Sequence, residues 1–234
     1  MIVGVNCGHT VSGTTGSGAA GILNESNETR EVGRKLMEYL KSRGVTVVDC
    51  TNDYASSVNE NLRNIVSMAD KRPLDLFVSI HFNSGGGKGC EVYTYNAQKY
   101  DEAVRVCGNM AKLGFVNRGV KDGSNLYVVR RTKAKAMLVE VCFVDSKSDA
   151  DLYRKVGADK VARAIGDAII GENKEEETKM IYNYVDKNMP EWAREAVQWC
   201  VDNGIVTGTG SGLNLDDMKL WTCVVMYRLW KKLK

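Results

Sequence analysis

Two histidines, the only two among 234 residues, each lie at the end of an apolar, strand-like run. Two imidazoles and one carboxylate, with one coordination position left open, are the ligands of many catalytic zinc sites. Two glutamates could complete such a site: Glu25 opens an amphipathic segment between His9 and His81, and Glu140 interrupts the apolar run 136–143. A carboxylate beside the metal could transfer protons. If the four side chains meet, they predict a zinc-dependent hydrolase.

Each of these residues also has a purely structural explanation. His9 could cap the end of a strand, and His81 could be a buried, hydrogen-bonded histidine. Glu25 would stand in the first turn of a helix, where the macrodipole favours a carboxylate whatever its role. Glu28 or Glu31 could then be the metal ligand instead. The residues alone leave the ligand set open.

Glu140 is harder to explain structurally. A carboxylate inside an otherwise apolar strand is costly unless it is paired, hydrogen-bonded or close to a metal. Glu91, between Cys90 and Val92, is the other strand carboxylate, but on an alternating strand it could point to solvent. Glu140 is therefore the preferred candidate for a proton-transfer group.

The elements that must position these residues alternate between strands and helices from residue 1 to about 170. Expected helices begin near 25, 57, 99 and 155. The expected strands, rich in Val, Ile and Tyr, are 2–7, 45–51, 75–82, 89–95, 126–130 and 136–143. This pattern predicts an α/β fold with a mostly parallel, twisted sheet of about six strands flanked by helices. Functional groups collect at the carboxyl ends of such strands, where both histidines would lie.

Three expected helices have an apolar face with helical spacing. The residues of these faces are Val32, Leu36 and Leu40; Val58, Leu62, Val66 and Ala69; and Val161, Ile165 and Ile169. The first helix is expected to end at Gly44, because glycine is a common helix stop.

A second, smaller unit is expected after the first. Residues 172–179 are polar and charged, which predicts a linker between a domain at 1–171 and a small, mainly helical domain at 180–234. Pro190 precedes one expected helix, and residues 215–230 form another. On the first of these helices, one face would hold Trp192, Ala196, Trp199 and Cys200. A unit this small is marginally stable alone.

Composition excludes several classes of protein. The net charge is +3 without long runs of like charge, so nucleic acid is not an expected partner. Seven scattered cysteines, none with CxxC spacing, predict free buried thiols in a reducing compartment. The N-terminus lacks a secretory signal pattern, and no apolar stretch approaches the roughly 20 residues that span a bilayer. We expect a protein made in soluble form inside a cell, with no membrane partner.

Four ordered motifs carry a resemblance to a known family. They are Cys7-Gly8-His9, Gly21-Ile22-Leu23-Asn24-Glu25-Ser26-Asn27, Ser79-Ile80-His81-Phe82-Asn83 and Leu138-Val139-Glu140-Val141-Cys142-Phe143. Together they resemble the zinc-dependent N-acetylmuramoyl-L-alanine amidases of the amidase-3 type, over about residues 1–170. The stretches Arg118-Gly119-Val120-Lys121 and Asn125-Leu126-Tyr127-Val128 are also similar to that family.

The resemblance implies a role for each candidate residue. His9, Glu25 and His81 would bind Zn²⁺, and Glu140 would be the catalytic carboxylate. The implied partner is peptidoglycan, and the implied substrate bond joins the lactyl group of N-acetylmuramic acid to L-alanine of the stem peptide. An amide is a poor electrophile with a poor leaving group, so it needs both a Lewis acid and a proton carrier.

Nearby basic residues could meet the carboxylates of the stem peptide. The candidates are Arg118, Lys121, Arg130, Arg131 and Lys133. A solvated face is the alternative explanation for most of them.

The C-terminal unit carries a second resemblance. The stretches 192–197 and 204–210 resemble a single S-layer-homology-like repeat, which implies binding to a wall polymer. One repeat in place of the usual three makes self-association through this domain an option. An amidase with such a tail and without a signal peptide looks like a bacteriophage endolysin, made in the host cytoplasm and acting on the wall after release. A host autolysin is the alternative.

Three hypotheses about function remain at this point. The first is a peptidoglycan amidase. The second is a non-catalytic peptidoglycan-binding protein on an amidase-like fold, with a structural metal. The third is a hydrolase of a different peptide amide. Glu140 favours catalysis, because an inert binding module has no need of a buried carboxylate.

Overall fold

The computed structural model describes residues 1–171 and 180–233. Contacts divide the chain into two compact units, Met1–Asn173 and Lys174–Lys234. Each unit has its own buried apolar core. The predicted linker 172–179 lies outside the described residues.

The first unit is built on one six-stranded sheet with the strand order β2-β1-β3-β6-β4-β5. The strands are β1 (Ile2–Cys7), β2 (Thr46–Asp49), β3 (Leu76–Asn83), β4 (Cys90–Thr94), β5 (Asn117–Asp122) and β6 (Ala136–Phe143). Neighbours are parallel except for the β4–β6 pair, which is antiparallel. The predicted mostly parallel sheet of six strands is confirmed.

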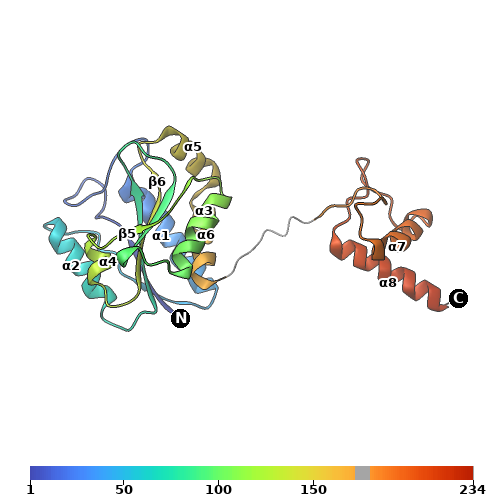
Figure 1. The fold of residues 1–234 in the computed structure, drawn as a ribbon, viewed down its shortest axis with the longest axis horizontal. Helices are drawn as coiled ribbons and strands as arrows, with labels where there is room; N and C mark the ends of the chain where they lie inside the picture. The colour runs from blue at the N-terminus through green and yellow to red at the C-terminus, as the bar shows by residue number, and fades with distance from the viewer. Residues whose placement is uncertain (172–179, 234) are drawn as a thin grey trace. The chain divides into compact units, whose positions relative to one another are not determined.

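Helices cover both faces of this sheet (Figure 1). They are α1 (Glu25–Ser42), α2 (Val58–Ala69), α3 (Asp101–Lys112), α4 (Tyr127–Arg131), α5 (Lys147–Val156) and α6 (Ala158–Ile170), with a 3₁₀ turn at Tyr95–Ala97. One core joins the sheet to α1, α3 and α6. A smaller core on the opposite face joins it to α2 and α4. The first unit is therefore a three-layer α/β structure.

Local sequence explains where the covering helices begin and which face they bury. Asn24 and Ser57 cap α1 and α2, because each side chain accepts a hydrogen bond from a backbone amide in the first turn. The predicted apolar faces of α1 and α6 are confirmed: Val32, Leu36 and Leu40, and Val161, Ile165 and Ile169, are all buried. On α2, Val58 is 54% exposed, so the predicted face is wrong at its first residue. The predicted Leu62, Val66 and Ala69 do contact the core, and Ile65, which the prediction omits, is buried with them.

Two local predictions are wrong, and one strand was not predicted. Residues 126–130 were expected as a strand, but Tyr127–Arg131 is a short helix whose Val128 and Val129 are buried against the α2 side of the sheet. The strand in this part of the chain is instead β5, which the apolar pattern did not predict because its residues are mostly polar and exposed. The helix expected near 155 is two helices, since Gly157 separates α5 from α6 with a φ of 83°.

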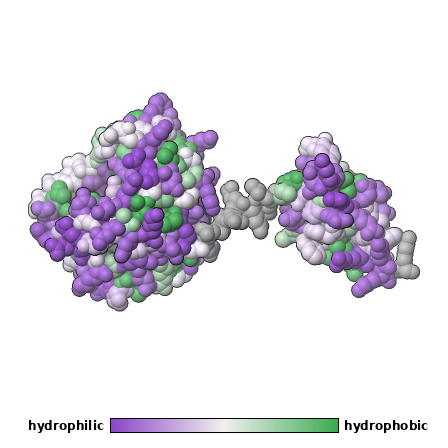
Figure 2. Space-filling view, viewed as in Figure 1, coloured by the Kyte–Doolittle hydropathy of each residue, from purple (hydrophilic) through white to green (hydrophobic). Residues whose placement is uncertain are grey.

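The second unit consists mainly of α7 (Glu191–Asp202) and α8 (Asp217–Leu233), which contact each other. Ala196 and Cys200 are buried as predicted, whereas Trp192 is 48% exposed and its ring lies 5.0 Å from that of Trp221 of α8, tilted by 35°. Figure 2 shows mainly hydrophilic residues on the visible face of each unit, with apolar residues scattered among them. The seven cysteines are all free and buried, as predicted. No helix of the described residues has the length and apolar character needed to cross a membrane.

Candidate metal centre

The candidate site lies on the α2/α4 face of the sheet, beyond the part that those helices cover. Phe77 of β3 and Leu138 of β6 belong to the small core beneath α2 and α4. His81 and Glu140 follow them on the same face of the same two strands, and they are register partners. The carboxyl ends of β3 and β6 therefore carry polar side chains instead of core residues.

His9 comes from the loop that follows β1. Its backbone has a φ of 64°, in the left-handed region that few non-glycine residues adopt. Its Nδ1 lies 3.2 Å from the carbonyl oxygen of Gly16, which fixes the ring and leaves Nε2 to face Glu25. The buried side chain of Arg30 braces this loop by donating to the carbonyl oxygens of Gly8 and His9 and to Asp53. No pattern in the sequence predicts this role of Arg30.

Glu25 is the first residue of α1 and is buried beside both histidines. Its Oε1 lies 3.1 Å from His9 Nε2 and 3.0 Å from His81 Nδ1, and its Oε2 accepts from the amide of Ala19 at 2.9 Å. Burial acts to raise the pKa of Glu25, but the hydrogen bonds from the two histidines hold it well below its ordinary value. The carboxylate is therefore ionised.

Two glycines allow these side chains to approach one another. A Cβ at Gly8 would lie 2.4 Å from Nε2 of His81, so the imidazole rests directly on the backbone at that point. A Cβ at Gly18 would lie 2.6 Å from Oε2 of Glu25 and 2.8 Å from Cδ2 of His9. Burial lowers the pKa of His81, which favours the neutral imidazole that metals bind.

The ligand atoms of His9, Glu25 and His81 all lie within 4.8 Å of one another. A tetrahedral zinc ion about 2.1 Å from each donor needs donor separations of roughly 3.4 Å, and the two histidine–glutamate separations of 3.1 and 3.0 Å are close to that value. Glu28 and Glu31, the alternative ligands, do not belong to this group. The two imidazoles and the ionised carboxylate thus fit zinc, with room for one further ligand.

Glu140 stands beside this group without ligating in it. Its Oε2 is buried and has no hydrogen-bond partner. Burial, together with the charges of Glu25 and Glu91, raises the pKa of Glu140 to about 8. Such a carboxyl can accept and return a proton near neutral pH.

The burial of Glu91 is the feature of this site that the sequence did not predict. Glu91 pairs with Glu140 across the antiparallel β4–β6 ladder and is only 3% exposed, so the expectation that it could point to solvent is wrong. Its oxygens accept hydrogen bonds from Asn83, Tyr93 and Arg118. Tyr93 is on β4 itself, but Asn83 and Arg118 come from β3 and β5, so the alternating pattern of β4 could not indicate them.

Comparisons with known proteins agree with this geometry. The family model described as N-acetylmuramoyl-L-alanine amidase matches residues 3–171. The chain is 30% identical over 164 residues to the endolysin of Bacillus phage SPP1, covering 66% of this chain and 59% of that one. It is 35% identical over 187 residues to an uncharacterized protein of Clostridium perfringens, covering 76% of this chain and 54% of that one. The chain thus spans a little over half the length of these relatives.

The first unit is also similar to solved structures of amidase and endolysin catalytic domains. The catalytic domain of the CD27L endolysin, which targets Clostridia difficile, superposes with a TM-score of 0.69 at 27% identity, covering 74% of this chain and 98% of that one. The catalytic domain of CwlV, an N-acetylmuramoyl-L-alanine amidase from Bacillus (Paenibacillus) polymyxa, gives a TM-score of 0.60 at 28% identity, covering 73% and 96%.

Proposed function

We propose that this chain, which belongs to the N-acetylmuramoyl-L-alanine amidase family, hydrolyses the amide between N-acetylmuramic acid and L-alanine in peptidoglycan with the help of zinc. The observation that carries the proposal is the convergence of His9, Glu25 and His81 beside Glu140. A non-catalytic binding module would not need a carboxyl buried with an unpartnered oxygen, because that oxygen destabilises the fold.

The residues of the site divide the work. Zinc held by His9, Glu25 and His81 would supply Lewis acidity, polarising the amide carbonyl and making water a stronger acid. Glu140 accepts the proton of the attacking water on its free Oε2 and delivers it to the departing amine of L-alanine. Burial raises the pKa of Glu140, which favours its protonated form once it has accepted the proton that it then delivers.

A chelation experiment tests the amidase proposal. Purified walls are incubated with the protein, with the chelator-treated protein, and with the treated protein after zinc is returned. We expect turbidity to fall with the untreated protein and with the zinc-restored protein, and to stay constant with the chelator-treated protein. The two active samples should also show new free amino groups on L-alanine. Binding to walls without release of amino groups would support the non-catalytic alternative. New amino groups on another residue would support a different peptide amide.

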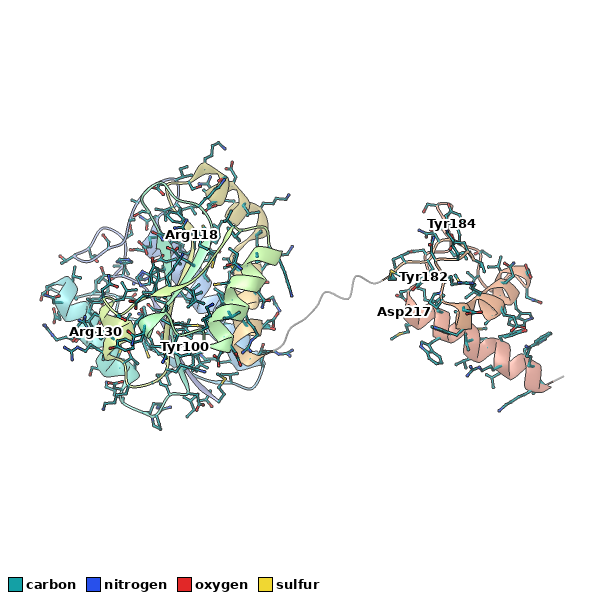
Figure 3. All side chains as sticks on the ribbon, in the orientation of Figure 1. Tyr100, Arg118, Arg130, Tyr182, Tyr184 and Asp217 are labelled. Atoms are coloured by element: carbon teal, nitrogen blue, oxygen red, sulfur yellow. The ribbon has the colours of Figure 1, made fainter. Side chains whose placement is uncertain are left out.

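We further propose that the second unit binds a wall polymer, as its S-layer-homology-like pattern implies, and that the protein acts as an endolysin on the wall after release. A hollow of about 500 Å³ in this unit is lined by residues that include Tyr184, Gln198 and Thr207. Tyr184, labelled in Figure 3, is 66% exposed. An aromatic ring beside amide and hydroxyl groups suits a carbohydrate ligand, since rings stack on sugars while polar groups fix orientation.

Truncation tests the role of the second unit. A chain ending at Gly171 should fold and bind zinc, because the sheet, both cores and all four site residues precede that point. It should cleave soluble muropeptides like the full chain but lyse intact walls more slowly, since a tether raises the local concentration of the enzyme. Equal lysis and equal sedimentation with walls would contradict the wall-binding proposal. Analytical ultracentrifugation of the full chain would show whether it self-associates.

A further inference from the structure

A row of polar side chains crosses four strands beside the metal site. The register pairs place His81 of β3 opposite Glu140 of β6, and Glu140 opposite Glu91 of β4. Residues directly opposite one another point to the same face of a sheet. Arg118 of β5 continues the row, because its Nε donates to Oε2 of Glu91 at 2.7 Å. Arg118 therefore belongs to the surface that contains the site.

The β-bulge at the edge of the sheet turns Arg118 toward Glu91. Cys90 pairs with Asn117 and Val92 pairs with Val120, so the two residues Arg118 and Gly119 oppose one residue of β4. Gly119 has a φ of 79°, which glycine adopts without strain. Bulges redirect side chains and are common next to active sites.

Two contacts hold the guanidinium in place. The buried carboxylate of Glu91 binds Nε, and the Phe143 ring lies under the guanidinium with 5.1 Å between Cζ and the ring centroid. The Arg118 side chain is nevertheless 36% exposed. A guanidinium anchored through Nε and one face keeps its outer N–H edge free to bind a carboxylate with two hydrogen bonds. An arginine whose sole role was to neutralise Glu91 would not need an exposed outer edge.

The spacing of strands gives the position of the expected partner on the substrate. Strands lie about 4.8 Å apart, so β4, whose Glu91 holds the guanidinium, is about 10 Å from β3, which carries the metal-site residue His81. Along a peptide, the carboxylate of the second residue beyond the scissile amide lies roughly 8 Å from the scissile carbonyl, given about 3.8 Å between consecutive Cα atoms. We propose that Arg118 binds the free α-carboxylate of the second stem-peptide residue and so makes the enzyme selective for stems in which that group is not amidated.

This inference deepens the proposed amidase function and is distinguished from the other basic candidates by geometry. Arg130 lies at a different part of the same unit, as its label in Figure 3 shows, on α4 and with Nη1 3.4 Å from the carbonyl oxygen of Ser124. Its replacement by glutamine removes the same charge and leaves His81, Glu140, Glu91 and Arg118 unchanged. Arg130→Gln is therefore the matched control for Arg118→Gln.

The experiment compares two soluble muropeptides that differ in one group: the second stem residue is D-glutamate with a free α-carboxylate, or its α-carboxamide. We expect the wild-type protein to cleave the carboxylate form with a kcat/KM about tenfold higher, the effect of one solvent-accessible charged hydrogen-bonded pair. Arg118→Gln should bring this ratio close to one, and Arg130→Gln should leave it unchanged.

Because Arg118→Gln leaves Glu91 without its cation, the double variant Glu91→Gln/Arg118→Gln provides a second test with both charges removed. It should also show a ratio near one, whatever its overall rate. Equal cleavage of the two substrates by the wild type would overturn the Arg118 proposal alone. A ratio that survives in both variants would overturn it too, as would equal changes in Arg118→Gln and Arg130→Gln. Cleavage of neither substrate by the zinc-loaded wild type would overturn the amidase proposal as well.

Discussion

Replacing Glu140 by glutamine should stabilise the metal-free protein while removing most of its activity. In the folded protein the pKa of Glu140 is raised from 4.5 to about 8, chiefly by burial. The unfolded chain therefore releases a proton that the folded protein keeps. A group whose pKa is raised by folding contributes fully to the free energy of unfolding below its pKa in the unfolded chain. That contribution is lost as the pH rises through its pKa in the folded protein.

The magnitude follows from the proton difference. Each pH unit between the two pKa values costs the folded state about 1.4 kcal/mol. Between about pH 5 and 7.5 the metal-free wild type should thus lose about 3 kcal/mol relative to Glu140→Gln, which has no proton to release. The other residues of the site are the same in both proteins, so their contributions largely cancel in the difference.

Urea unfolding of both proteins in chelator, at several pH values in this range, measures the effect. Glu38→Gln, at an exposed position of α1, is the control and should follow the wild type at every pH. With zinc present, Glu140→Gln should bind the metal normally and lose about 10²–10⁴-fold in kcat. A stability difference that stays constant across the pH range would refute the assignment of a protonated Glu140.

Four further substitutions test the site and its support. His9→Ala or His81→Ala should each lower zinc content and abolish lysis, and a folded variant with normal zinc and activity would remove that residue from the ligand set. Gly18→Ala should weaken zinc binding by about 10–100-fold, because the new Cβ would lie 2.6 Å from an oxygen of Glu25; an unchanged zinc titration would contradict this packing. Asp149→Ala should destabilise the fold by about 2–4 kcal/mol, because two buried backbone amides lose their acceptor, and thermal unfolding would measure the loss.

Local signals in the sequence were sufficient for the elements that carry the metal site. The run before each histidine is apolar because nearly all of its residues in β1 and β3 are buried. The start of α1 at Glu25 follows from the cap at Asn24 and from the buried face of the helix. These elements depend mainly on nearby residues, so their positions could be predicted.

The structure around β4 and β5 could not be predicted, because it depends on contacts between residues far apart in the sequence. β5 has a neighbour on one side only, so it needs few apolar residues, and the sequence Asn117–Asp122 does not look like a buried strand. Val128 and Val129 favour a strand by their branched side chains, yet one turn of helix buries both against the sheet. The burial of Glu91 depends on the antiparallel pairing of β4 with β6, which no local pattern encodes.

The left-handed backbone at His9 has a consequence for attempts to improve this protein. Strain of this kind costs about 1–3 kcal/mol, and glycine or asparagine would relieve it. A library of variants sorted only for heat resistance should therefore enrich those two residues at position 9, and the survivors would have given up a candidate metal ligand. At position 9, selection for thermal stability and selection for the proposed activity therefore favour different residues. Stabilising substitutions in this loop should be sought with His9 kept unchanged.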